Sequence, residues 1–140
     1  MTMNISPMRA HVLIADAGTS PWTRSLAETL QPWPVDVHWS RSDVEAIGMA
    51  SATGIHVAVV DNGLPSGGGL GLLRRVRNLG MGFPCLLVSE AADPRLLQAA
   101  LELGVFSVLT STQRNLLTPM VLKVFRKVYQ FDWMQSIDTN

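Results

Sequence analysis

The feature that most constrains the fold is an alternation of short apolar runs, each followed by a polar residue, with segments of helical periodicity. The apolar runs are the expected strands, and they lie at residues 12–15, 35–39, 55–60, 84–88 and 105–109. Strands that are buried on both faces are continuously apolar, as most of these runs are, so a parallel sheet is indicated. Five β-then-α units with right-handed crossovers predict an α/β doubly wound, (βα)5 three-layer sandwich.

Capping residues and helix breakers mark the helices between these runs. The expected helices run from Ser20-Pro21 to about 30, from Ser42 to about 53, from about 70 to 79, from Asp93-Pro94 to about 103, and from about Thr118 onwards. Ser20, Ser42 and Asp93 are the expected N-caps, because a short polar side chain can accept from the free amides of a first turn. In the last helix, a stripe of Val121, Val124, Phe125 and Val128 is expected to face the sheet.

Three polar residues end neighbouring strands if the sheet has the flavodoxin-like order 2-1-3-4-5. Asp16 follows the first strand, Asp61 the third, and Ser89 the fourth. Sites in such sheets form at the carboxyl ends of the strands, beside the point where the strand order reverses. We expect the two carboxylates to converge there and to hold a divalent cation and a phosphoryl group through oxygen ligands. The plainer alternative is that each aspartate only caps the loop after it.

Five segments match the pattern of one known family, and in chain order they are 12–16, 59–65, 69–77, 84–89 and 100–104. Over about residues 10–130 the chain resembles the receiver domain of two-component response regulators, as an atypical, chemotaxis-regulator-like member. Each segment alone is a weak indication, whereas five in order at the family spacing are strong. The resemblance implies two-component signal transduction by phosphorelay.

The resemblance also implies roles for individual residues. Asp61 stands at the phosphoacceptor position, and Ser89 is the hydroxyl that senses the phosphoryl group. Asp16 belongs to the acidic pocket. The implied cofactor is Mg²⁺, held by Asp16, Asp61 and the backbone carbonyl of Gly63.

Three positions depart from the family pattern. Ala17 replaces a second acid, Ser111 falls where the family has a lysine, and Val108 falls where many members have an aromatic residue. Losing one preorganised electrostatic group costs about 3 kcal/mol, or roughly 100–1000-fold in rate. We therefore predict a degenerate pocket with weak Mg²⁺ binding and slow or absent phosphorylation. Arg114 is a candidate substitute cation, although an arginine at the start of a loop or helix is more often solvated.

The predicted function is that of a stand-alone receiver domain spanning residues 10–132, between tails at 1–9 and 133–140. It is not expected to be an enzyme, because no Ser-His-Asp or Cys-His arrangement can be argued from the spacings. The expected partner is a histidine kinase or another signalling protein. The fourth helix, fifth strand and last helix are the expected contact face, including for a homodimer.

Composition argues against nucleic-acid-binding, membrane-spanning and disulfide-bonded proteins. Eleven basic and eleven acidic residues cancel, which gives no general field for nucleic acid or an anionic membrane. No apolar run approaches the roughly 20 residues of a membrane helix, and a cytoplasmic location is expected. The single cysteine, Cys85, excludes an intrachain disulfide.

The alternative function is a flavodoxin-like domain that binds a small ligand or nucleotide. The negative charge of Asp16 and Asp61 argues against it.

Two other features have plain interpretations. The glycine-rich segment 66–69 lacks the residues of a phosphate-binding loop and is expected to be a flexible loop. His11, His38 and His56 belong to three different strands, and His11 and His56 lie at their starting edges. A metal site made from these three histidines is not expected.

Overall fold

The computed structural model describes residues 9–18, 20–65, 67–131 and 133–134. Strands and helices alternate along them as the sequence pattern predicts. The elements are β1 (Ala10–Ala15), α1 (Trp22–Leu30), β2 (Val35–Ser40), α2 (Asp43–Ala52), β3 (Val57–Asp61), α3 (Gly68–Asn78), β4 (Cys85–Ser89), α4 (Pro94–Glu102), β5 (Ser107–Thr110), the 3-10 helix η1 (Ser111–Leu116), α5 (Leu117–Val124) and the π-helical turn η2 (Phe125–Tyr129).

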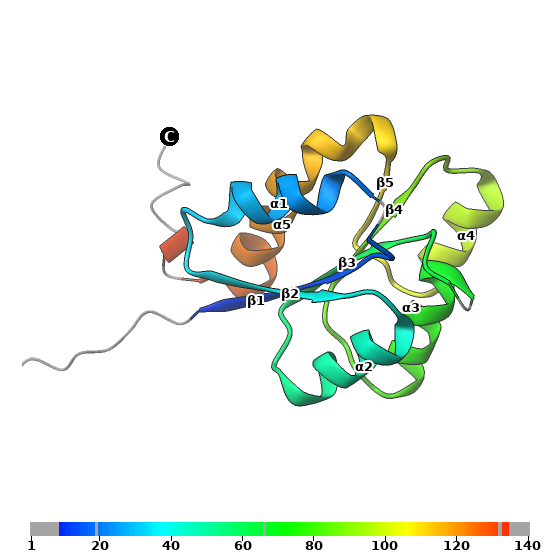
Figure 1. The fold of residues 1–140 in the computed structure, drawn as a ribbon, viewed down its shortest axis with the longest axis horizontal. Coiled ribbons are helices and arrows are strands. Elements are labelled where there is room, and N and C mark those ends of the chain that lie inside the picture. The colour runs from blue at the N-terminus through cyan, green and yellow to red at the C-terminus, as the bar shows by residue number, and fades with distance from the viewer. Residues whose placement is uncertain (1–8, 19, 66, 132, 135–140) are drawn as a thin grey trace, which may run out of the picture.

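The five strands form one parallel sheet in the order β2-β1-β3-β4-β5, which confirms the predicted topology. Helices α1 and α5 cover one face of the sheet, and α2 and α3 cover the other (Figure 1). Each face has its own apolar core, one built on Ile14, Leu26 and Phe125, the other on Leu13 and Leu72. The molecule is therefore a three-layer sandwich.

Two of the three predicted N-caps are confirmed. Ser42 accepts a hydrogen bond from the Glu45 amide at 3.1 Å, and Asp93 accepts one from the Leu96 amide at 2.8 Å. The prediction for Ser20 is wrong, because Pro21 takes the N-cap position of α1 and has no side-chain cap. The Ser20 hydroxyl is engaged elsewhere, as described below.

The last helical segment departs from the predicted stripe. It begins earlier, as η1, and after α5 it widens into the π-helical turn η2. The wider turn rotates the following side chains, so Val128 is exposed while Val121, Val124 and Phe125 are buried. Beyond η2, Trp133 and Met134 pack against the apolar core on the α1 and α5 face.

The glycine-rich segment is not simply a flexible loop. Gly67 is the N-cap of α3 with a φ of 104°, and Gly68 and Gly69 form its first turn. Ser66, together with residues 1–8 and 135–140 of the expected tails, lies outside the described residues. Within the described part of the chain, no helix has both the length and the apolarity needed to cross a membrane.

Candidate functional site

A cleft of about 470 Å³ opens at the carboxyl edge of the sheet, over the ends of β3 and β4. Parallel strands deliver their last residues to one edge, beside the reversal of strand order between β1 and β3. The start of α1, the loop after β3 and η1 complete its walls. The lining residues are Ser20, Pro21, Trp22, Asp61, Asn62, Gly63, Val88, Ser89, Glu90, Ser111 and Arg114.

Asp61 ends β3, and its carboxylate accepts hydrogen bonds from three neutral donors. Oδ1 accepts the amide of Gly63 at 2.7 Å. Oδ2 accepts the Ser20 hydroxyl and the Trp22 indole Nε1–H, each at 2.9 Å. Hydrogen bonds to a charged group are stronger than neutral ones, so these three donors hold the carboxylate firmly in place.

Asp16 directly follows β1 and is only 5% exposed. Its Oδ2 accepts the amides of Gly18 at 3.1 Å and Ser20 at 3.4 Å, so the carboxylate caps its own loop. Asp16 lines a separate hollow of about 330 Å³ with Arg24 and Arg41. The sheet thus brings Asp16 and Asp61 to neighbouring strand ends, where Ser20 links them through its amide and its hydroxyl.

Ser89 and Gly63 both lie in the cleft with Asp61. The Ser89 hydroxyl donates to the carbonyl of Ala91 at 2.7 Å, which engages it with its own loop. At Gly63, an added Cβ would come within 2.9 Å of Asp61 Oδ1. Glycine is therefore needed there for the backbone amide to approach the carboxylate this closely.

Helix η1 places Ser111 and Arg114 on the wall of the cleft that contains Asp61. The Thr110 amide donates to the side chain of Gln113 at 3.1 Å, which fixes the start of this helix. A 3-10 helix has three residues per turn, so residues i and i+3 are eclipsed. Ser111 and Arg114 accordingly both line the cleft, where Arg114 is the basic lining residue beside the acids Asp61 and Glu90.

The other two divergent positions lie outside this lining. Val108 belongs to β5 and packs against the apolar core on the α2 and α3 face. Ala17 directly follows Asp16 in the loop after β1 and is partly exposed. The methyl group of Ala17 offers no ligand for a cation.

The fold and the cleft define a doubly wound α/β domain with an acid at the carboxyl end of its third strand. The family model of the response regulator receiver domain matches residues 12–120. The chain belongs to this family, which acts in two-component signal transduction. Receiver domains are generally signalling modules rather than enzymes.

Solved structures of receiver domains share the fold at low sequence identity. A CheY-like receiver domain protein from Methanospirillum hungatei JF-1 is 20% identical, with a TM-score of 0.74, and the match covers 88% of this chain and 99% of that one. The chemotaxis protein CheY4 from Vibrio cholerae is 22% identical, with a TM-score of 0.73 and coverages of 84% and 99%. The receiver domain of a LuxO repressor-like protein from Vibrio parahaemolyticus is 16% identical, with a TM-score of 0.78 and coverages of 91% and 98%. A comparison with curated proteins finds no match.

Receiver domains typically bind Mg²⁺ at the phosphorylation site, but the donor set described here fits that ion poorly. Mg²⁺ requires several oxygen ligands in near-octahedral positions. Asp61 Oδ2 faces an indole N–H and a hydroxyl, and Asp16 Oδ2 faces two backbone amides. A cation could reach Asp61 Oδ2 or Asp16 Oδ2 only by displacing these donors.

Local sequence does not indicate the contact of Trp22 or of Ser20 with Asp61. Both stand next to Pro21 at a helix start, where local chemistry indicates only a cap. The packing of α1 against the end of β3, about forty residues away along the chain, aims both side chains at Asp61. The only indication in the sequence is chemical: a tryptophan indole N–H can only donate, so it needs an acceptor such as a carboxylate that ends a strand.

Proposed function

We propose that this receiver domain carries its phosphoacceptor position at Asp61 in a degenerate pocket, so that phosphorylation is slow or absent. The observation that carries the proposal is the hydrogen bonding of Asp61, whose carboxylate is satisfied by Ser20, Trp22 and Gly63. A carboxylate that already accepts three hydrogen bonds is a poorer nucleophile. On this proposal, the domain acts mainly through protein–protein contacts.

The charge distribution of the cleft supports the same proposal. In phosphoryl transfer, a carboxylate oxygen of Asp61 would attack phosphorus while the bond to the donor nitrogen or oxygen breaks. Catalysis of this step depends on positioning and on neutralising charge on the phosphoryl oxygens. Ala17 and Ser111 supply no such charge, and Arg114 remains as the basic residue in the described lining. Ser89 would sense the phosphoryl group only after releasing the Ala91 carbonyl.

Incubation with acetyl phosphate and Mg²⁺, followed by intact-mass measurement, tests this proposal. We expect little or no gain of one phosphoryl mass over times that fully modify a typical receiver domain. Rapid and complete modification that disappears in Asp61→Asn would overturn it.

A matched variant tests whether the missing groups are the cause. Ala17→Asp combined with Ser111→Lys restores an acid beside Asp16 and an ammonium at the wall of the cleft. We expect phosphorylation of Asp61 to accelerate by about 100-fold or more, the effect of one preorganised electrostatic group. The same double variant carrying Asp61→Asn is the control and should gain no mass. An unchanged rate in the double variant would show that another feature of the cleft limits the reaction.

We further propose that α4, β5 and α5 form the contact face for signalling partners, including a histidine kinase or a second copy of the chain. Leu97 and Leu101 on α4 and Phe106 before β5 are large exposed apolar side chains. On α5, a hollow of about 410 Å³ is lined by Pro119, Met120 and other residues. Exposed apolar side chains that gather on one face are typical of an interaction surface.

The alternative of a small-ligand or nucleotide site has less support. Asp61 and Glu90 both line the cleft and repel a phosphate group, against a single arginine. A strong rise in melting temperature with flavin or nucleotide would favour it over the receiver proposal.

A further inference from the structure

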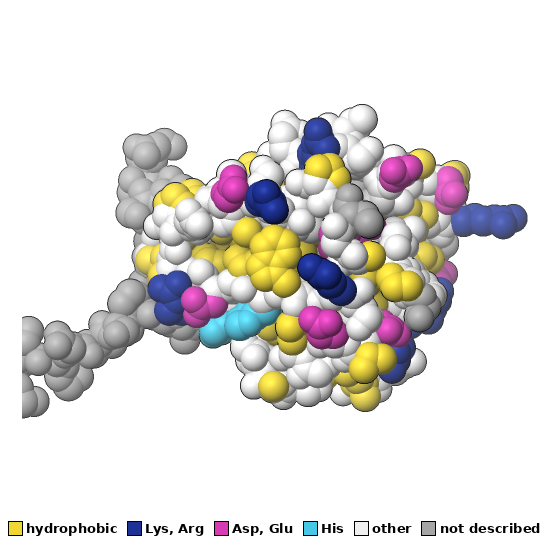
Figure 2. Space-filling view, viewed as in Figure 1, with side chains coloured by type: hydrophobic (Ala, Val, Ile, Leu, Met, Phe, Trp, Pro, Cys, Tyr) yellow, Lys and Arg dark blue, Asp and Glu magenta, His cyan; other side chains and the backbone are white. Residues whose placement is uncertain are grey.

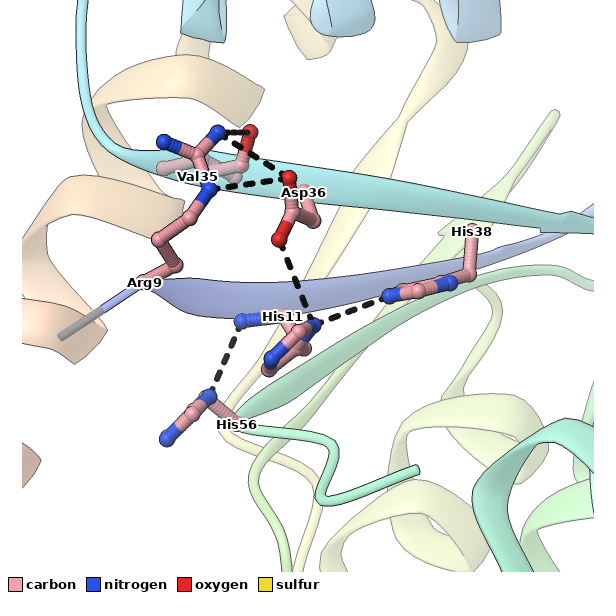
Figure 3. Close-up of polar contacts among 6 residues, drawn as sticks. All are labelled: Arg9, His11, Val35, Asp36, His38 and His56. Carbon is pink, nitrogen blue, oxygen red and sulfur yellow. Dashed lines mark hydrogen bonds and ion pairs between the residues drawn. The ribbon is translucent and has the colours of Figure 1, made fainter. Parts of the chain in front are cut away.

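A cluster of imidazoles and a carboxylate lies on β1 and β2, outside the candidate site. The parallel register pairs His11 with Asp36 and Leu13 with His38. Because side chains alternate along a strand, His11, Asp36 and His38 project from the same face of the sheet. Figure 3 shows the three side chains turned toward one another. The cluster lies toward the starts of the strands, whereas Asp61 stands at a strand end.

The distance between the two imidazole nitrogens suits metal ligation, whereas the carboxylate oxygen is still too far away. His11 Nδ1 lies 3.0 Å from His38 Nε2, and Asp36 Oδ2 lies 3.9 Å from His11 Nδ1. Zinc binds imidazole nitrogen at about 2.0–2.1 Å, so one ion can touch both nitrogens at an N–Zn–N angle of about 95°. Increasing the distance between the two nitrogens by a few tenths of an ångström gives the tetrahedral angle.

We propose that His11 Nδ1, His38 Nε2 and Asp36 Oδ2 bind one divalent transition-metal ion, with Zn²⁺ as the representative ion. Two imidazoles and one carboxylate are a ligand set that zinc favours, with the fourth position left to water. The side chains of His11 and Asp36 are 29% and 41% exposed, so an ion can enter from solvent. Figure 2 shows histidine at the molecular surface beside basic and acidic side chains.

The carboxylate of Asp36 must move closer to the two imidazoles before all three side chains can bind one ion. As the described residues are placed, no group of three or more His, Cys, Asp or Glu side chains can hold a metal ion, so the site forms only if the carboxylate moves. Arg9 Nε donates to Asp36 Oδ1 at 3.0 Å, which leaves Oδ2 as the oxygen nearer His11. A modest rotation of the carboxylate closes the gap while Arg9 keeps its hold on Oδ1. Such a partner on the second oxygen is typical of ligating carboxylates.

His56 is close to the cluster but does not belong to the ligand set. Its ring stacks on His11 with the centroids 5.8 Å apart. Its Nδ1 accepts the backbone amide of His11 at 2.9 Å, so that nitrogen is unavailable to a metal. His56→Gln is therefore a matched control for His38→Gln.

Calorimetric titration of the full chain with Zn²⁺ alone, after chelator treatment and dialysis, tests the proposal. We expect one equivalent to bind, and His38→Gln or Asp36→Asn to weaken binding by more than about tenfold, a loss seen when even a second-shell partner is removed. His56→Gln and Asp61→Asn should bind as the unchanged chain does. This outcome does not depend on phosphorylation at Asp61.

A second measurement needs no variant. Zn²⁺ should shift the ring resonances of His11 and His38 in the unchanged chain, and the shift should saturate at one equivalent. Absence of saturable binding would overturn the proposal and leave the 3.0 Å contact as a hydrogen bond that shares one proton. Equal binding by His38→Gln, or loss of binding in Asp61→Asn, would overturn it too.

Discussion

At the scale of single residues, Trp22 distinguishes this cleft. Its indole Nε1–H donates to the same Asp61 oxygen as the Ser20 hydroxyl, each at 2.9 Å. The ring itself is 5% exposed and packs in the core on the α1 and α5 face. One side chain therefore links the candidate phosphoacceptor to the packing of α1.

Trp22→Phe should lower the free energy of unfolding by about 1–3 kcal/mol, because the carboxylate loses a donor while most of the ring packing is kept. The measurement is the urea midpoint at neutral pH. Trp39→Phe is the matched control, since Trp39 is 44% exposed and should shift the midpoint little. Equal effects of the two variants would show that the indole hydrogen bond contributes nothing measurable.

Cys85 gives a prediction about pH. Burial raises the pKa of its thiol from 9.0 to about 11, although Arg77 acts in the opposite direction. The folded chain then keeps the thiol proton to higher pH than the unfolded chain, so this contribution to stability is present below pH 9 and is lost as the pH rises toward about 11.

We expect iodoacetamide to alkylate Cys85 in urea but hardly at all in the native chain at pH 8–9. Intact mass measures the modification. In Cys85→Ala, the fall of the unfolding midpoint above pH 9 should be smaller than in the unchanged chain. Ready alkylation of the native chain would contradict the assigned burial.

At the scale of elements, the junction between β3 and α3 holds the site in place. An added Cβ at Gly69 would come within 2.9 Å of both the Asp61 carbonyl oxygen and Leu87 Cδ1. The first turn of α3 thus packs directly on the strand end that carries Asp61. This contact explains a glycine inside the first turn of a helix, where glycine is otherwise unfavourable.

Gly69→Ala should lower the free energy of unfolding by about 1–3 kcal/mol through overpacking. Gly48→Ala is the matched control, because Gly48 lies inside α2 and its added Cβ meets nothing within 4 Å. There alanine should stabilise the chain by about 0.5–1 kcal/mol. Denaturant unfolding measures both, and effects of the same sign would contradict the packing at Gly69.

At the scale of the whole molecule, the proposed contact face predicts self-association. Leu101 on α4 is 72% exposed, the largest exposed fraction among the exposed large apolar side chains of the described residues. We expect the chain to form dimers as its concentration rises, and Leu101→Glu to stay monomeric, because the introduced charge would be buried in the interface. Sedimentation equilibrium measures both. A matched change on α2, Val44→Glu, should leave the dimer intact, and a chain that is monomeric throughout would contradict dimer formation.

The sequence by itself determined the order of elements, the parallel sheet, and the strand ends that carry Asp16, Asp61 and Ser89. It also predicted the caps at Ser42 and Asp93. These features follow from hydrophobic periodicity and capping chemistry, which act over a few neighbouring residues.

Only the tertiary structure decided which side chains meet across the sheet. The contact of Trp22 with Asp61, the contact of His11 with His38, and the place of Arg114 in the cleft all join segments far apart in sequence. Strand register and helix packing set such contacts, and both result from burying whole faces rather than from any local pattern. The exposure of Val128 was also outside the reach of the sequence pattern. A single π-helical turn rotates the side chains after α5 away from the face that a 3.6-residue period predicts.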